Sequence, residues 1–290
     1  MNRNARLCVA AIAWLCSSPV FAQSTVARAR QLIASDSAAS AISMLHSAIN
    51  SGHDSAAYHV WLAAAYADEG SRAFTFRQVL YTFRIKSELK RASGIDSNSI
   101  DAHGELARFY LTAPSILGGS FSRAEQEATK LVSSSPGRSH GLLGFVAHHR
   151  GDFKTAEREM RSAIAAQPDS AWSYTPLAFL LGEQQRNDEA FALWEKSVTL
   201  DSTFKDSYFQ MGVIGSTTGT HLEAAAQALE HYIANTRRLS DAKIRASAHN
   251  KLGLIYEKLG RVNDARRAYQ EAITLAPNSS TYKASLKGLG

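Results

Sequence analysis

The chain has 290 residues, 45% hydrophobic and 20% charged, which is a composition typical of globular proteins. Its 32 basic residues outnumber 26 acidic ones, and they are scattered, with the densest groups at 84–91, 237–238 and 266–267. Nucleic-acid binders usually gather positive charge into a stripe with groove-reading motifs, so we expect no nucleic-acid partner. Only six prolines and many alanines favour helices over sheets.

The first 22 residues have the features of a secretory signal peptide. Arg3 and Arg6 precede an apolar stretch at 7–15 that is too short to span a bilayer, and Val20 and Ala22 fit the small-residue pattern of a cleavage site. We therefore expect export to the periplasm of a Gram-negative bacterium, with cleavage after Ala22.

Both cysteines, Cys8 and Cys16, lie in this segment, so the mature chain is expected to have no disulfide, thiol nucleophile or thiolate metal site. Lipid attachment at Cys16 is an alternative, but the preceding residues 13–15 lack the small residue usual in lipoprotein signals. No later segment has 18 uninterrupted apolar residues, so we expect no membrane span in the mature chain.

Residues 23–96 are expected to form degenerate helix pairs. A short helix at 24–34 precedes one at 37–50, in which small and apolar residues recur at helical spacing. Another helix at 58–70 precedes a partner at about 72–93, which is unusually long.

The next unit, 97–136, carries the sequence PSILGGSFS between its helices at 102–110 and 122–137. Its turn is expected to be enlarged, because 18 residues separate Leu106 from Ala124, against 13 between the corresponding residues 143 and 156.

We interpret this turn as an insertion. Pro114 ends the first helix, Gly118 and Gly119 permit positive φ angles, and Ser122 with Glu125 fits a capping box. The alternative is an anion site, because backbone N–H groups at a helix N-terminus bind anions, but the nearby Arg123 is weak support.

From residue 137 onward the sequence repeats itself. The segments 155–170, 188–203 and 264–279 share an alanine, a large apolar residue four positions later and a small residue three positions after that. Alanines at 156, 190 and 224 recur every 34 residues, and the next, at 265, follows after 41.

A partner helix precedes each of these segments, and its small residue beside Leu or Met allows two helices to approach closely. Punctuation separates the partners, with Asp152, Thr220 and Asn263 as expected N-caps and Thr220–Glu223 as a capping box. Pro176 stands inside a first helix and is expected to kink it.

This pattern resembles the tetratricopeptide repeat, a helix–turn–helix unit of 34 residues. Residues 248–278 match best, through Leu252, Gly253, Tyr256, Ala265, Tyr269, Ala272 and Pro277. Units at 137–170 and 171–204 are good, the unit at 205–245 is degenerate, with Ala228 where a large aromatic is usual, and the last is 246–279. The array is taken to cover 97–290.

The resemblance implies an all-α, right-handed superhelical solenoid of about six such helix pairs with a concave groove. In this family, ligands usually meet inward-facing side chains of the first helices. The positions in this chain that we take as candidate partner contacts are Arg108, Phe145, His149, Trp172, Phe179 and Phe209.

The aromatic residues in this set indicate a protein or an extended apolar peptide as the partner. The alternative is that these side chains only fill the packing between helices, as helical-period aromatics often do.

The sequence contains none of the HExxH, phosphate-loop, nucleophile-elbow or dinucleotide-binding motifs, so we expect no enzyme activity, no cofactor and no metal site. His148 and His149 fit a polar helix end. Two other hypotheses stay open: a small-ligand or anion binder or enzyme that uses the Gly118–Gly119 turn and the groove histidines, and a self-associating structural module. The sequence leaves the oligomeric state open.

Overall fold

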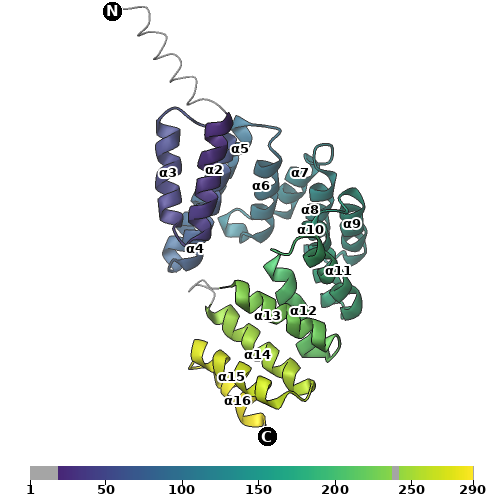
Figure 1. The fold of residues 1–290 in the computed structure, drawn as a ribbon. Helices are drawn as coiled ribbons and strands as arrows, with labels where there is room; N and C mark the ends of the chain where they lie inside the picture. Colours follow the sequence, from purple (N-terminus) through teal and green to yellow (C-terminus); the bar gives the residue numbers. More distant parts are fainter. Residues whose placement is uncertain (1–18, 237–241, 290) are drawn as a thin grey trace, which may run out of the picture. The chain divides into compact units, whose positions relative to one another are not determined.

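A computed structural model describes residues 19–236 and 242–289 of the chain (Figure 1). Within these residues it contains 15 α-helices, one short 3-10 helix and no strand. The expected signal peptide lies outside the described residues over positions 1–18. No helix in the described ranges combines the length and the apolar character needed to cross a membrane.

The chain divides into two compact units, which meet between Ser135 and Pro136. The sequence places its main boundary between 96 and 97, so the structure differs by one helix pair. The predicted helix at 122–137 is shorter than expected and ends at Thr129, and Pro136 opens the next helix instead of closing this one. Proline is well suited to a first helical turn because its missing N–H needs no partner there.

Unit 1 consists of three consecutive helix pairs, with the 3-10 helix inside the third. Its elements are α2 (Pro19–Ala34), α3 (Ala38–Asn50), α4 (Ala56–Arg72), α5 (Thr75–Ile95), α6 (Ile100–Thr112), η1 (Ser115–Leu117) and α7 (Phe121–Thr129).

Unit 2 consists of four helix pairs and a final helix. Its elements are α8 (Pro136–His149), α9 (Phe153–Ala166), α10 (Ala171–Glu183), α11 (Asn187–Leu200), α12 (Lys205–Thr218), α13 (Leu222–Asn235), α14 (Ala242–Lys258), α15 (Val262–Leu275) and α16 (Ser280–Gly288).

Each pair in unit 2 is closed by a large side chain of the second helix that fits against a small residue of the first. Met160 lies over Gly144, Leu229 over Gly212 and Tyr269 over Gly253, and in each case an added Cβ would overlap with the facing side chain. Without a Cβ in the way, the helices approach closely enough to exclude water from the contact.

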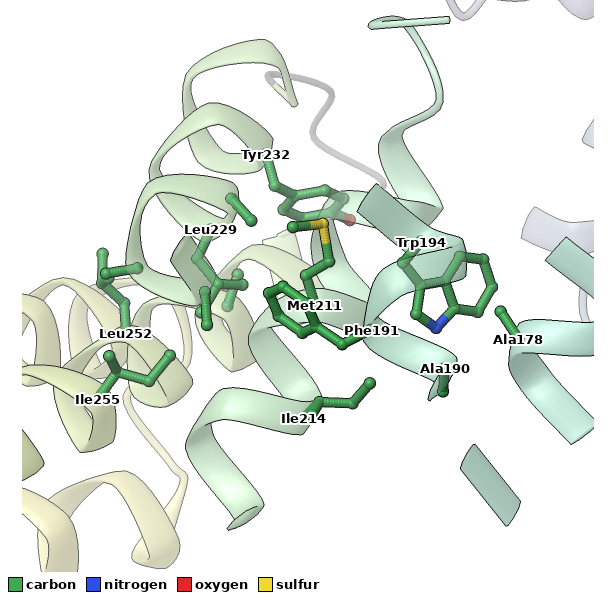
Figure 2. Packing of buried hydrophobic residues seen from close by; sticks show 14 of the residues in the cluster. Ala178, Ala190, Phe191, Trp194, Met211, Ile214, Leu229, Tyr232, Leu252 and Ile255 are labelled. Carbon is green, nitrogen blue, oxygen red and sulfur yellow. The ribbon is translucent and has the colours of Figure 1, made fainter. Parts of the chain in front are cut away.

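The core of unit 2 runs through successive pairs. Figure 2 shows Phe191 and Trp194 of α11 close to Met211 of α12, with Leu229 of α13 and Leu252 of α14 beyond them. Because each pair buries its apolar face against the next, no pair carries a complete core of its own.

The fit at Gly212 corrects the predicted register of the degenerate unit. Its second helix buries Ala225, Leu229 and Tyr232, one residue later than the 34-residue spacing predicts, because the turn before it is one residue longer. Leu229 therefore occupies the position that the sequence analysis assigns to Ala228.

The predicted N-caps have mixed outcomes. Asp152 caps α9, where its carboxylate accepts the Thr155 N–H at 3.0 Å. Ser120, and not Ser122, caps α7, and α13 and α15 begin after His221 and Arg261, not at the predicted Thr220 and Asn263.

The enlarged turn at 114–122 folds back on its own unit. Gly118 has φ +99°, and Gly119 lies so close to the Ala113 carbonyl that an added Cβ would overlap with it. The Ser120 N–H donates to the Tyr110 carbonyl at 2.8 Å, which fastens the end of the turn to α6. The two glycines are therefore needed for the path of the chain itself.

Candidate functional site

The candidate site lies on the first helices of unit 2, where two clefts adjoin. The first cleft, of about 250 Å³, lies between α8 and α10. Phe145, His148 and His149 of α8 line one side, and Phe179 and Glu183 of α10 line the other. Its floor is formed by Met160, Pro176 and Leu180.

The second cleft, of about 540 Å³, lies between α10 and α12 with the start of α11 beneath it. Gln210, Val213 and Thr217 of α12 face Phe179 and Glu183 of α10 across it. These three α12 residues are spaced three and four apart, so they share one face of the helix. Both apolar and hydrogen-bonding groups are therefore present along the second cleft.

Phe179 and Glu183 line both clefts and so form the ridge between them. The Phe179 ring stands edge-on to Trp194 with the ring centroids 4.7 Å apart, and the side chain is still 41% exposed. Trp194 itself is 2% exposed, so a buried indole fixes the direction of an exposed phenyl ring. Phe179 is therefore held in place and remains open to a ligand.

The helix that carries Phe179 runs unbroken through Pro176, although the sequence predicts a kink there. Proline cannot donate the hydrogen bond that the Trp172 carbonyl would normally accept. The Thr175 hydroxyl donates to that carbonyl instead, at 3.0 Å. This substitute bond satisfies the acceptor and keeps α10 in one piece.

A charged pair crosses the first cleft. His148 Nε2 lies 2.5 Å from a Glu183 carboxylate oxygen, and the His148 ring also contacts His149 and Phe153 edge-on. The sequence interpretation of His148 and His149 as a helix end is compatible with their position at the end of α8, but His148 also connects two first helices. The pair forms a polar rim beside apolar walls.

The structure thus brings together Phe145, His149 and Phe179 from the predicted set. Trp172 and Phe209 stay in unit 2 but serve packing. The Trp172 ring lies over Gly141 of α8, and the Phe209 ring contacts Tyr232 of α13 with centroids 5.3 Å apart. For these two residues, the geometry favours the packing alternative.

Arg108 belongs to unit 1, where it lines a separate cavity of about 590 Å³ with Arg30, Trp61, Asp101 and Glu105. Arg108 Nη2 lies 3.3 Å from a Glu105 oxygen, one helical turn before it. It is described there by itself and not as part of the two clefts.

Sequence reasoning did not select Glu183, Gln210 and Thr217. The signal was present, since each lies three or four residues from Phe179 or Val213 on the same helix face. What the sequence does not show is that clefts open beside these faces.

The Gly118–Gly119 turn lies near one cation that the sequence did not suggest. The Lys86 ammonium of α5 lies against Gly118 and within 6.0 Å of the Phe109 ring centroid. Burial lowers the pKa of Lys86, and the charges of Arg123 and Lys90 lower it further. Within the described residues, no group of three or more His, Cys, Asp or Glu side chains could hold a metal ion.

Comparison with known proteins identifies one repeat by sequence. The family model described as tetratricopeptide repeat matches residues 246–279. No curated protein matches the chain.

Solved structures share the fold at low sequence identity. YrrB, described as a tetratricopeptide-repeat protein with an unusual peptide-binding site, is 16% identical, with a TM-score of 0.51 over 69% of this chain and 97% of YrrB. PilF of Pseudomonas aeruginosa is 17% identical, with a TM-score of 0.54 over 79% of this chain and 95% of PilF.

The Cut9–Hcn1 structure from the APC/C is 14% identical, with a TM-score of 0.61. The match covers 90% of this chain and 48% of that one. At these identities the likeness concerns the fold alone. One unit matching by sequence and the helix-pair fold of the described residues make this chain a tetratricopeptide-repeat protein.

Proposed function

We propose that this protein is a non-catalytic scaffold of the cell envelope that binds an extended segment of another protein across α8, α10 and α12. The observation that carries the proposal is Phe179, an exposed aromatic side chain between two adjoining clefts. Aromatic anchors with apolar surroundings supply much of the binding energy at protein interfaces.

The clefts suit an extended chain better than a compact ligand. Side chains of an extended segment alternate in direction, so successive ones can enter the two clefts on either side of the Phe179 ridge. Gln210, Thr217 and Asn187 offer side-chain donors and acceptors along the second cleft for the backbone of such a segment. The segment is expected to present apolar side chains to Phe145 and Phe179 and a polar group to the His148–Glu183 pair.

The comparisons support this proposal without supplying the partner. The tetratricopeptide fold is a protein-interaction fold, and YrrB is described as having a peptide-binding site. The envelope location rests on the signal-peptide features of residues 1–22. The non-catalytic role rests on the lack of a recognisable catalytic motif in the sequence.

The proposal is tested by selecting linear peptides from a displayed library on the wild-type protein and measuring their affinity by fluorescence anisotropy. Phe179→Ala should weaken binding of the selected peptides by about tenfold or more, as expected for loss of an aromatic anchor.

Glu195→Ala is the matched control, because Glu195 is exposed on α11 of the same repeat and lines neither cleft. It should leave the affinity unchanged. Equal affinity of the wild-type protein and the Phe179→Ala variant for every selected peptide would rule out the proposed anchor. Phosphate or metal that copurifies at stoichiometric amounts would favour the small-ligand hypothesis instead.

A further inference from the structure

One helix of unit 1 exposes a row of large apolar side chains. Phe76, Leu80 and Phe83 of α5 are 76%, 49% and 51% exposed, and Phe74, just before the helix, is 91% exposed. The three helical residues are spaced four and three apart, so they lie along one face. We call these four residues the α5 stripe.

The stripe is not the packing face of the helix. Leu89 and Ala92, which lie on the other side of α5, are buried at 2% and 0% exposure. The helix therefore has one apolar face for its own unit and a second, partnerless in the described residues, toward solvent. Contiguous exposed apolar surface of this kind marks an interaction site.

Positive charge borders the stripe on both sides. At 100° per residue, Arg77 and Arg84 fall along one edge and Lys86 and Lys90 along the other. α5 has a single carboxylate, Glu88, and it is bound to His59. Among the residues that the structure describes, Arg77, Lys86 and Lys90 form no ion pair with a carboxylate.

The enlarged turn adds to this surface. η1 packs on α5, and its Ile116 is 88% exposed. Arg123, at the start of α7, lies over the Tyr110 ring at 5.8 Å, and Lys86 lies at 5.9 Å from the same ring. Both cations are thus positioned by Tyr110 near the turn.

We propose that the α5 stripe docks unit 1 on an anionic phospholipid membrane. The phenyl and leucyl side chains enter the interfacial region, and the bordering cations contact lipid phosphates. Surface-bound helices combine these features, with Phe and Leu on one face and Lys and Arg beside it. This proposal is independent of the peptide-binding role of unit 2.

The charges and the shape favour a membrane over other occupants. A second copy would bring the same cations against each other. Nucleic acid would leave the exposed Phe and Leu side chains without a role. A projecting row of aromatic side chains needs a matching groove in a protein partner, whereas a bilayer interface receives it without one.

The test places an environment-sensitive fluorophore on the stripe. The full chain with Cys8→Ser, Cys16→Ser and Leu80→Cys carries one thiol, which is labelled and mixed with vesicles of phosphatidylcholine alone or with phosphatidylglycerol. Ser43→Cys in the same background is the control site, since Ser43 is exposed on α3 of the same unit.

The label at 80 should brighten and shift to shorter wavelength only on the anionic vesicles, and the label at 43 should not. Raising salt from about 0.05 M to about 0.5 M should reverse the change, because screening weakens attraction to the lipid charge. A label at 80 that stays water-like on anionic vesicles, or that responds equally to neutral ones, overturns the proposal.

Two further variants separate apolar insertion from charge. Phe76→Ser with Phe83→Ser should weaken vesicle binding by about tenfold, because two apolar side chains are lost from the interface. Arg77→Gln with Lys90→Gln should weaken it several-fold, while the matched pair Lys196→Gln with Lys283→Gln in unit 2 should not. Circular dichroism checks that each variant is folded, and equal binding by all of them contradicts a role for the stripe.

Discussion

At the scale of single residues, the molecule separates two kinds of aromatic side chain that the sequence does not distinguish. Phe179 and Phe209 occupy equivalent first-helix positions, yet Phe179 is exposed above Trp194 and Phe209 packs on Tyr232. The difference arises from the neighbouring helix, since only the α10 side opens into clefts. Helical periodicity gives the position of an aromatic but not whether a cleft lies beside it.

The two phenylalanines should therefore respond differently to truncation. Phe209→Ala should lower the free energy of unfolding by about 2 kcal/mol through lost core contacts. Phe179→Ala should lower it by about 1 kcal/mol or less, because much of that ring already meets solvent. Chemical denaturation of the two variants measures both values, and a larger loss for Phe179→Ala would assign that residue to the core.

His59 makes the strongest case for a pH-sensitive contact. Its Nδ1 lies 2.5 Å from a Glu88 oxygen and its Nε2 lies 2.7 Å from an Asp54 oxygen. Burial lowers the pKa of His59, but the hydrogen bonds and charges of Glu88 and Asp54 outweigh burial and raise the pKa above 6.5. The imidazolium thus stabilises the fold fully below about pH 6.5 and stops doing so as pH rises through the folded-state pKa.

Replacing His59 by Asn should cost about 3 kcal/mol at low pH, as for a buried charged pair that loses one partner. The gap between wild type and variant should shrink as pH increases. Thermal unfolding followed across pH 5 to 8 at about half-unit steps tests this linkage. Parallel curves for the two proteins would show that His59 does not contribute through its charge.

At the scale of helices, histidines on three first helices bond to glutamates on their own second helices. His59 pairs with Glu88, His103 with Glu127 at 2.6 Å and His140 with Glu159 at 2.8 Å. The partners are separated by 29, 24 and 19 residues along the chain. Sequence spacing cannot reveal such pairs, because they form only when two helices lie antiparallel at a particular register.

The helix pairs themselves were predictable, because a repeated pattern of small and large residues encodes how two helices fit. The register of α13 was not, since one added residue in the turn before His221 moves Leu229, and not Ala228, over Gly212. The early end of α7 was missed for a similar reason, because the proline at 136 also fits a helix start.

The enlarged turn provides a direct test of element packing. Gly119→Ala should lower the free energy of unfolding by about 2 to 4 kcal/mol, because the new Cβ overlaps with the fixed Ala113 carbonyl. Gly94→Ala in α5 is the control, since nothing lies within 4 Å of its Cβ position and alanine favours the helix. Denaturation midpoints compare the two, and a harmless Gly119→Ala would contradict the described path of the turn.

At the scale of the molecule, the two units present different surfaces. Unit 2 offers adjoining clefts on its first helices, and unit 1 offers a basic apolar stripe on a second helix. The repeat pattern made the all-helical class predictable, but the surfaces depend on side chains outside that pattern. A scaffold built from such repeats can change its partners at these positions without changing its core.

The central claim is that a partner protein occupies the clefts beside Phe179. A photo-crosslinking amino acid placed at position 179 in the living cell tests this directly, with the same group at Glu195 of α11 as the control. The account predicts a discrete crosslinked protein from 179, attached through one short segment, and none from 195. Crosslinks at 179 that are absent, or no more specific than those at 195, would contradict it.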